Sequence, residues 1–273
     1  EDWSTDGWGS RGEELKVTLD PVNSRNKVAQ FDYPFYDSAD FGYVCWGETR
    51  WGESCSVDGQ QRRKFFKENP GAMSSFINGV GPGSGGGEWY VYLGGAFYEA
   101  TVSFRARFSD DFNVVKGGKF FGFQAQKGST ALVMFEPENR LKYYVYHLDM
   151  HGLYGEGPFI EDSDIFDGQW HDVSITMRMN DVGFSNGAVG VSIDGVQRNS
   201  YDGLRFRETA DVGVQTFWVS TFFGGDKERR CYDYQVAASE FDCDVYSDGS
   251  NYYFYAPRKD EKLWVDDLVV SAK

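Results

Sequence analysis

Short segments in which apolar and polar residues alternate constrain the fold of this chain most strongly. The clearest of them spans 101–108 and alternates with a period of two, which is the period of a β-strand with one buried face. Its apolar members are Val102, Phe104, Ala106 and Phe108, and its polar members are Ser103, Arg105 and Arg107. This pattern predicts a half-buried strand that places two arginines in one row on its polar face.

Similar short segments recur along the chain and are separated by turn residues rather than by helical patterns. Asn186-Gly187 and Asp194-Gly195 bound one of them with two strong hairpin signals. The segment Gln60–Lys67 is the best candidate for a short helix, and Gly81–Gly87 predicts a surface loop. Further strands are expected at Val28–Tyr33, Trp89–Leu93 (a buried strand), Ser129–Phe135, Trp170–Met179, Val212–Phe223 and Leu263–Val270.

Composition agrees with an all-β fold. Aromatic residues make up 18% of the 273 residues, and the chain contains 33 glycines. Aromatic residues favour strands, and glycines favour the tight turns between them. No Pro-rich or Ser-rich linker divides the chain, so residues 1–273 are expected to form a single domain. The predicted architecture is an antiparallel two-sheet β-sandwich.

The formal net charge is -15 at pH 7. Such an excess of acids argues against nucleic acid or an anionic membrane as a general partner. It leaves room for a locally basic groove, because charges are screened over about 8 Å at physiological salt.

Four cysteines form two local pairs in the sequence, Cys45 with Cys55 and Cys231 with Cys243. Disulfides within these two pairs are the simplest arrangement, although the sequence alone allows other connectivities. Disulfides form in oxidising compartments, and the chain opens at Glu1 without a methionine or a transmembrane run. We therefore expect a mature, secreted protein.

Several polar side chains follow the first alternating strand. Lys119 comes after two glycines, and Gln124 and Gln126 follow it on the next predicted strand. Tyr144 and Tyr146 stand two residues apart, so both phenols are expected on one face of their strand. We expect these cationic, amide and phenolic groups to meet the two arginines on one sheet face, in a polar groove. His147 would point to the opposite face from Tyr146, His171 is expected to be structural, and His151 lies in a long loop where binding groups often sit.

The order of several motifs resembles polysaccharide lyase family 14 over roughly residues 28–273. The segment from Tyr98 to Phe123 resembles the family's Lys-Gly-Gly-Lys-Leu-Pro-Gly-Leu region, and Tyr144-Val-Tyr146-His147 resembles its Tyr-x-Tyr strand. The remaining matching motifs are Tyr154–Glu156, Gly168–His171, Asn186-Gly187, Asp194-Gly195, Leu204–Arg207, Ser220–Asp226 and Trp264–Asp267. The resemblance implies a β-jelly roll that cleaves a uronic-acid polymer by β-elimination.

By this resemblance, Lys119, Tyr144 and Tyr146 correspond to the family's functional lysine and tyrosine pair. Tyr146 is the expected proton-transfer group, and Lys119 either lowers the pKa of that tyrosine or acts as the base. Substrate binding is expected from Arg105, Arg107, Gln124, Gln126 and His151. The resemblance also implies a structural Ca²⁺ at Asp266 and Asp267, between the terminal strands.

The chain departs from the family's pattern at two places. Phe120-Phe-Gly-Phe123 stands where the family has Leu-Pro-Gly-Leu, and Thr130-Ala-Leu132 stands where it has Ser-x-Arg, so an arginine is missing. Two hypotheses therefore remain. The first is a secreted monomeric lyase for an acidic polysaccharide, with glucuronan preferred to alginate. The alternative is a non-catalytic carbohydrate-binding jelly roll, and a hydrolase of neutral glycans is a distant third.

Overall fold

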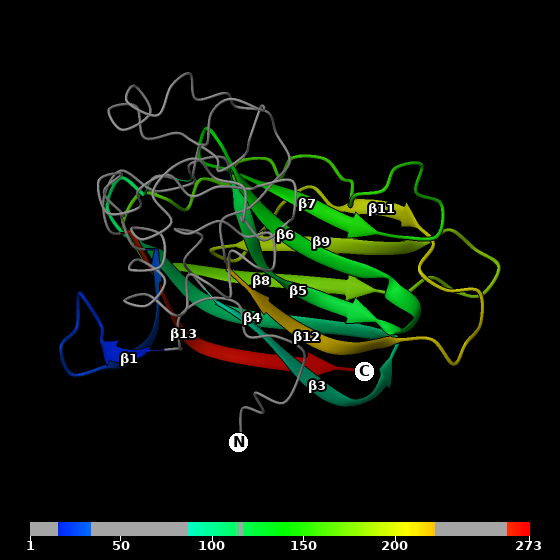
Figure 1. Ribbon diagram of the computed structural model, residues 1–273, viewed down its shortest axis with the longest axis horizontal. Helices are drawn as coiled ribbons and strands as arrows, with labels where there is room; N and C mark the ends of the chain where they lie inside the picture. The colour runs from blue at the N-terminus through cyan, green and yellow to red at the C-terminus, as the bar shows by residue number, and fades with distance from the viewer. Residues whose placement is uncertain (1–15, 34–86, 113, 115–116, 222–260) are drawn as a thin grey trace, which may run out of the picture.

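The computed structural model describes residues 16–33, 87–112, 114, 117–221 and 261–273, which form two antiparallel sheets and contain no α-helix (Figure 1). The strands are β1 (Lys16–Leu19), β2 (Lys27–Tyr33), β3 (Glu88–Phe97), β4 (Glu99–Phe108), β5 (Gly118–Ala125), β6 (Thr130–Glu136), β7 (Arg140–Tyr146), β8 (His171–Arg178), β9 (Gly187–Ile193), β10 (Val196–Gln197), β11 (Tyr201–Leu204), β12 (Val214–Ser220) and β13 (Glu261–Ala272). A 3-10 turn, η1 (Gln126–Gly128), follows β5. No helix in this described part is long and apolar enough to cross a membrane.

The eight-stranded sheet has the order β1-β2-β13-β4-β8-β9-β10, with β11 also paired to β9. The five-stranded sheet has the order β3-β12-β5-β6-β7. Strands distant in sequence are neighbours in both sheets, as in β13 beside β4 and β12 beside β5 (Figure 1). The predicted all-β sandwich of the jelly-roll type is therefore confirmed.

The core lies between the two sheets and is rich in phenylalanine. From the large sheet, β4 contributes Phe104 and Phe108, as the alternation of 101–108 predicts. From the small sheet, Phe120, Phe121 and Phe217 pack against them, and all three are fully buried. The ring of Phe104 lies 4.7 Å from that of Phe121 and 5.5 Å from that of Phe120 between centroids. Burial of such side chains stabilises a fold by about 1.5–3 kcal/mol each.

A β-bulge in β5 changes which residues of this strand face the core. Lys119 pairs with Met134 and Gly122 pairs with Leu132, so three steps along β5 match two steps along β6. The extra residue lets Phe120 and Phe121 both point inward, with their rings stacked at 5.0 Å. Lys119 and Gln124 consequently lie on the same outer face, although they are five positions apart.

Gly122 follows the bulge at a point of close approach between β5 and β6. A Cβ atom at this position would lie 2.0 Å from the carbonyl oxygen of Ala131 and 2.7 Å from the Cα of Leu132. Both are backbone atoms, so a side chain cannot be accommodated by a change of rotamer. The local geometry of β5 therefore depends on glycine here.

The amide of Asn180, which is fully buried, joins the end of β8 to the segment after β11. Its Oδ1 accepts hydrogen bonds from the backbone N–H groups of Phe206 (2.8 Å) and Arg207 (2.9 Å). Its Nδ2 donates to the carbonyl oxygens of Asp181, Phe184 and Arg207 at 2.9–3.0 Å. One buried side chain therefore bonds to five backbone groups of these segments.

Most of the predicted strands occur within a few residues of their expected limits, but the expectation that Trp89–Leu93 is a buried strand is wrong. It belongs to β3, which ends the five-stranded sheet, and Tyr92 is 62% exposed. Aromatic residues on the outer face of this strand, such as Tyr92, make the sequence apolar although that face is not fully buried. The predicted helix Gln60–Lys67, the loop Gly81–Gly87 and both cysteine pairs lie outside the described residues, except for Gly87, which precedes β3.

Replacing Gly122 by alanine is expected to lower the free energy of unfolding by about 1–3 kcal/mol or more, because β5 and β6 must move apart. Urea unfolding followed by circular dichroism measures this change. Gly190→Ala on β9 is the matched control, since a Cβ there meets only the flexible end of Gln197 at 3.3 Å. Equal stability of the two variants would contradict the proposed close approach.

Candidate functional site

The outer face of the five-stranded sheet carries all three predicted catalytic side chains. The strand register aligns residues of all five strands in rows across this face. One row contains Tyr90, Trp218, Gly122, Leu132 and Tyr144, and the next contains Tyr92, Thr216, Gln124, Thr130 and Tyr146. On the other side of the first row, Lys119, Met134 and Lys142 form a shorter row.

Tyr144 and Tyr146 form the centre of the candidate site. Both side chains are half-buried on the outer face of β7, whereas Tyr143, which directly precedes them, points into the core. The two phenol oxygens are 2.9 Å apart and share a hydrogen bond, and the rings meet edge to face. Either phenol can therefore donate to the other, so a negative charge on one would be stabilised by a hydrogen bond from its neighbour.

Tyr143 differs from this pair in its surroundings. Its hydroxyl donates to the carbonyl oxygen of Asn199 at 2.6 Å, and burial raises its pKa well above the ordinary value of 10. This phenol therefore stays protonated and has a structural role in the core.

Lys119 lies on the same outer face, two strands from Tyr144. Its ammonium is 4.8 Å from the ring centroid of Trp218 on the neighbouring strand β12. The ring of Trp218 stacks in turn on that of Tyr90, with 5.2 Å between centroids. This contact fixes the position of the lysine by attraction between the cation and the aromatic face.

The predicted glutamines lie near this group. Gln124 is half-buried on the outer face of β5, in the row that ends at Tyr146. Gln126 lies beyond the strand end, in the turn η1, where its backbone N–H donates to the carbonyl oxygen of Gly213 at 3.2 Å. Thr130 and Leu132, which replace the family's Ser-x-Arg motif, stand opposite Tyr146 and Tyr144.

Arg105 and Arg107 lie on the other sheet, so the prediction that they share a face with Lys119 and the tyrosines is wrong. They project from β4 on the outer face of the eight-stranded sheet, on the opposite side of the core. Arg105 lies over the ring of Trp170 at 5.0 Å and 3.7 Å from a carboxylate oxygen of Asp172. Arg107 lies 5.9 Å from the ring of Trp264. Both arginines therefore contact side chains on or beside the neighbouring strands of their own sheet.

The loop after β7 returns along the edge of that strand. Glu156 exchanges backbone hydrogen bonds with Val145 at 2.9 and 3.0 Å, and the backbone N–H of Ile160 donates to Leu141 at 2.9 Å. The side chain of Glu156 also lies 2.9 Å from Nε2 of His147. His147 thus faces away from Tyr146, as the alternation predicts, while His151 is exposed in the same loop.

His171 lies between two carboxylates at the start of β8. Its Nδ1 is 2.8 Å from Asp194 and its Nε2 is 2.9 Å from Asp167. Burial disfavours the charged ring, but the two carboxylates outweigh it and raise the pKa of His171 above 6.5. Burial acts to raise the pKa values of Asp167 and Asp194. The hydrogen bonds with His171 act in the opposite direction, and both pKa values are lowered. This arrangement joins two loops of the large sheet and agrees with the expected structural role.

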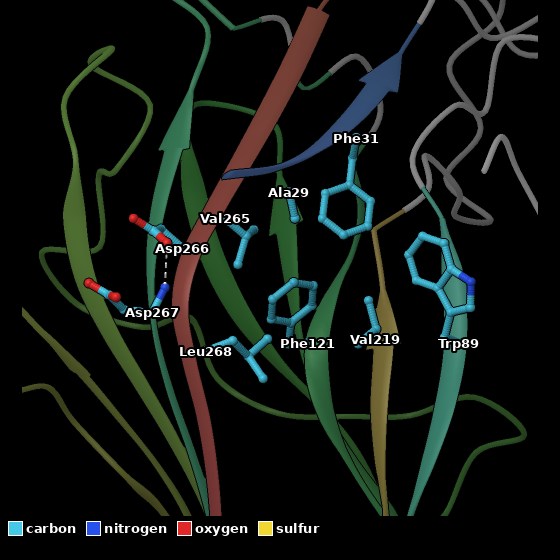
Figure 2. Close-up of a pocket in the computed structure, with 9 residues that line it drawn as sticks. All are labelled: Ala29, Phe31, Trp89, Phe121, Val219, Val265, Asp266, Asp267 and Leu268. Atoms are coloured by element: carbon cyan, nitrogen blue, oxygen red, sulfur yellow. Dashed lines mark hydrogen bonds between the residues drawn. The ribbon is translucent and has the colours of Figure 1, made fainter. Parts of the chain in front are cut away.

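Asp266 and Asp267 lie at a bulge in β13, beside a cavity of about 250 Å³ between the sheets. Figure 2 shows that the cavity is lined mainly by apolar side chains such as Phe31, Trp89 and Phe121, and that both carboxylates point away from it. Asp266 accepts a hydrogen bond from Asn26 at 2.6 Å. Within the described ranges, no group of three or more His, Cys, Asp or Glu side chains is placed to hold a metal. Two carboxylates fall short of the six to eight oxygens that Ca²⁺ takes.

Some side chains of the site were not predicted from the sequence. Trp218, Tyr90 and Lys142 all lie on the tyrosine face, and each belongs to an alternating strand segment. The alternation predicts which residues share a face within each strand. The sequence does not say which strands lie beside β5 and β7, so their meeting at one site could not be foreseen.

Comparison with known proteins agrees with the sequence motifs. The family model described as polysaccharide lyase 14 matches residues 163–238. No curated protein matches the sequence. The predicted resemblance to polysaccharide lyase 14 is confirmed by this match, which supports an enzyme of the polysaccharide lyase class.

Solved structures share the fold at low sequence identity. Alginate lyase vAL-1 from Chlorella virus superposes with a TM-score of 0.57 at 15% identity, covering 97% of this chain and 91% of that one. A marine alginate lyase from Aplysia kurodai gives a TM-score of 0.57 at 14% identity, covering 97% of this chain and 90% of that one. Alginate lyase Aly36B in complex with alginate trisaccharide gives a TM-score of 0.52 at 18% identity, covering 70% of this chain and 77% of that one.

The stability that His171 contributes is expected to depend on pH. Because the folded-state pKa of His171 is raised, its contribution is complete below about pH 6.5 and is lost as the pH rises through the raised value. Because the two aspartate pKa values are lowered, their contribution is lost in acid, below about pH 4. His171→Gln should therefore destabilise the protein by about 1 kcal/mol near pH 5–6 and by less above pH 8.

Chemical unfolding of both proteins across this pH range measures the difference. His151→Gln, in an exposed loop, is the control. A titration of the His171 ring by NMR that gave a pKa at or below 6.5 would contradict the expectation.

Proposed function

We propose that this chain, which resembles polysaccharide lyase 14 in sequence and alginate lyases in fold, cleaves a uronic-acid polymer by β-elimination. The reaction takes place on the outer face of the five-stranded sheet. The observation that carries the proposal is the hydrogen-bonded pair of Tyr144 and Tyr146 on the same face as Lys119. These are the three side chains for which the sequence resemblance implies catalytic roles.

The proposed chemistry needs three groups. A base removes the proton at C5 of the uronate, which is acidic only when the adjacent carboxylate is neutralised. The electron pair forms the C4–C5 double bond as the bond to the leaving O4 breaks, and an acid then protonates O4. General acids and bases contribute about 10²–10⁴-fold each to such a reaction.

Tyr146 is proposed as the proton-transfer group. Its neighbour Tyr144 lies within hydrogen-bond distance and can donate to a phenolate at Tyr146. Lys119 adds a positive charge to the same face, which favours the developing enediolate. Gln124 lies in the row of Tyr146 and can donate its amide N–H groups to a sugar oxygen or carboxylate.

The preferred substrate is a separate part of the proposal. The solved structures described above are alginate lyases, and glucuronan is preferred from the sequence because Leu132 replaces the arginine of the family's motif. Both polymers carry a carboxylate on each sugar, so the same proton-transfer groups would serve either of them.

Secretion, monomeric action and a structural Ca²⁺ at Asp266 and Asp267 are further proposals that come from the sequence. A chelator tests the third of them. Loss of thermal stability on addition of the chelator, restored by Ca²⁺, would support a bound calcium ion.

A second candidate function, a non-catalytic carbohydrate-binding jelly roll, is favoured by one observation. Leu132 places an apolar side chain directly opposite Tyr144, where the family's motif has a cation. Such a protein would bind an acidic polysaccharide on the same face and produce no new chain ends.

Tyr146→Phe and Lys119→Met are each expected to reduce turnover by about 100-fold or more, because each removes a group that acts on the transferred proton. The ultraviolet absorbance of the unsaturated uronate measures turnover on glucuronan, on alginate blocks and on a neutral glucan. A rise on a uronate polymer alone supports β-elimination and names the substrate.

Tyr98→Phe is the matched control, since it removes a phenol oxygen that bonds Asp181 at 3.1 Å, away from the proposed site. Full activity of both site variants would overturn the assignment of residues. A flat absorbance trace for the unaltered protein on every uronate, with saturable binding, would favour the binding module instead.

A further inference from the structure

The proposed reaction requires a cation that neutralises the uronate carboxylate, and the position opposite Tyr144 does not supply it. Leu132 occupies that position with an apolar side chain. Arg105 and Arg107 lie on the opposite sheet, so they cannot reach a polymer bound at the tyrosine pair. In the described part of the chain, the candidates for this charge are the cations on the outer face of the five-stranded sheet.

Three described cations lie on this face: Lys119, Arg140 and Lys142. Arg140 is committed to Glu138, with 3.0 Å between their charged groups, at the turn between β6 and β7. Lys119 lies over Trp218 and serves the proton transfer. Arg205, at the adjacent loop, is bound to both carboxylate oxygens of Asp149 at 2.5 and 3.2 Å. Lys142 is left.

The position of Lys142 suits the binding of a carboxylate beside the tyrosines. It stands two residues before Tyr144 on the same face of β7, so their Cα atoms are about 7 Å apart. Across the sheet it forms a row with Met134 and Lys119. The two lysines thus flank the apolar side chain of Met134 from strands on either side of β6.

The ammonium of Lys142 lies beside an aromatic ring. It is 5.6 Å from the ring centroid of Phe159, in the segment that runs along the edge of β7, and the guanidinium of Arg140 lies over the same ring at 3.9 Å. Lys119 lies over Trp218 in a similar way, at 4.8 Å. Among the residues that the structure describes, no carboxylate lies within salt-bridge distance of Lys142. A cation beside a ring and without an acidic partner there is ready to take an anionic ligand.

We propose that Lys142 binds a carboxylate of the uronate chain beside Tyr144, as a specificity-determining residue in place of the missing arginine. This inference rests on the proposed function. It gives the polymer two cationic contacts on this face, at Lys119 and Lys142. A neutral glycan would lack the carboxylates that these contacts require.

Steady-state kinetics on the uronate polymer test the inference with Lys142→Met, Lys142→Arg and Lys27→Met. Lys27 is exposed on β2 of the other sheet, so Lys27→Met makes the same change of charge away from the site. Lys142→Met is expected to raise KM by about tenfold or more with a smaller change in kcat, since one charged contact is lost. Lys142→Arg should keep KM within about threefold of the unaltered protein, because the charge is retained.

Calorimetric titration of a uronate oligosaccharide into the Tyr146→Phe protein, with and without Lys142→Met, separates binding from catalysis. A tenfold weaker affinity supports the role of Lys142 even if the unaltered protein turns over no uronate, in which case only the proposed function fails. Lys142→Met that behaves as Lys27→Met in both measurements overturns the inference while turnover stands. An equal loss in Lys142→Arg and Lys142→Met would also overturn it, since the effect would then come from shape rather than charge.

Discussion

The bulge in β5 and the close contact at Gly122 determine what the five-stranded sheet presents to solvent. In a regular strand, Lys119 and Gln124 would face opposite sides, because they are five positions apart and faces alternate at every position. The extra residue at Phe120 and Phe121 places both rings in the core and returns the strand to its outward register. One local irregularity therefore anchors the aromatic core on one side and aligns polar side chains on the other. Bulges commonly re-aim side chains beside functional sites in this way.

The cations of the described chain are divided between the two outer faces, and this division has electrostatic consequences. The net charge of -15 would repel an anionic polymer at long range. Within the screening length of about 8 Å, a bound chain responds to Lys119 and Lys142 rather than to distant acids. Both ammonium groups lie over aromatic rings, which attract a cation without neutralising its charge. The face can therefore hold a local positive charge on an acidic protein.

The sequence predicts individual strands well because period-two alternation reports directly on burial. The inward row from Val102 to Phe108 and the shared face of Tyr144 and Tyr146 both follow from it. Alternation does not say to which sheet a strand belongs, so the arginines of β4 were placed with the tyrosines, although they lie on the other sheet. It also fails at Phe120-Phe121, where the bulge breaks the period. The tryptophan beside Lys119 comes from a strand about a hundred residues further along the chain, and only the sheet order brings the two together.

The segment that returns along β7 has a consequence for the behaviour of the protein at high concentration. β7 is the last strand of the five-stranded sheet, and its outward N–H and C=O groups would otherwise offer a template for a strand of another molecule. Backbone hydrogen bonds between three residues of β7 (Leu141, Tyr143 and Val145) and residues 156–160 occupy that edge. Pro158 takes part in this cover through its carbonyl oxygen, which accepts from the backbone N–H of Tyr143 at 3.1 Å. The strand that carries the tyrosine pair is thus closed at its edge to self-association.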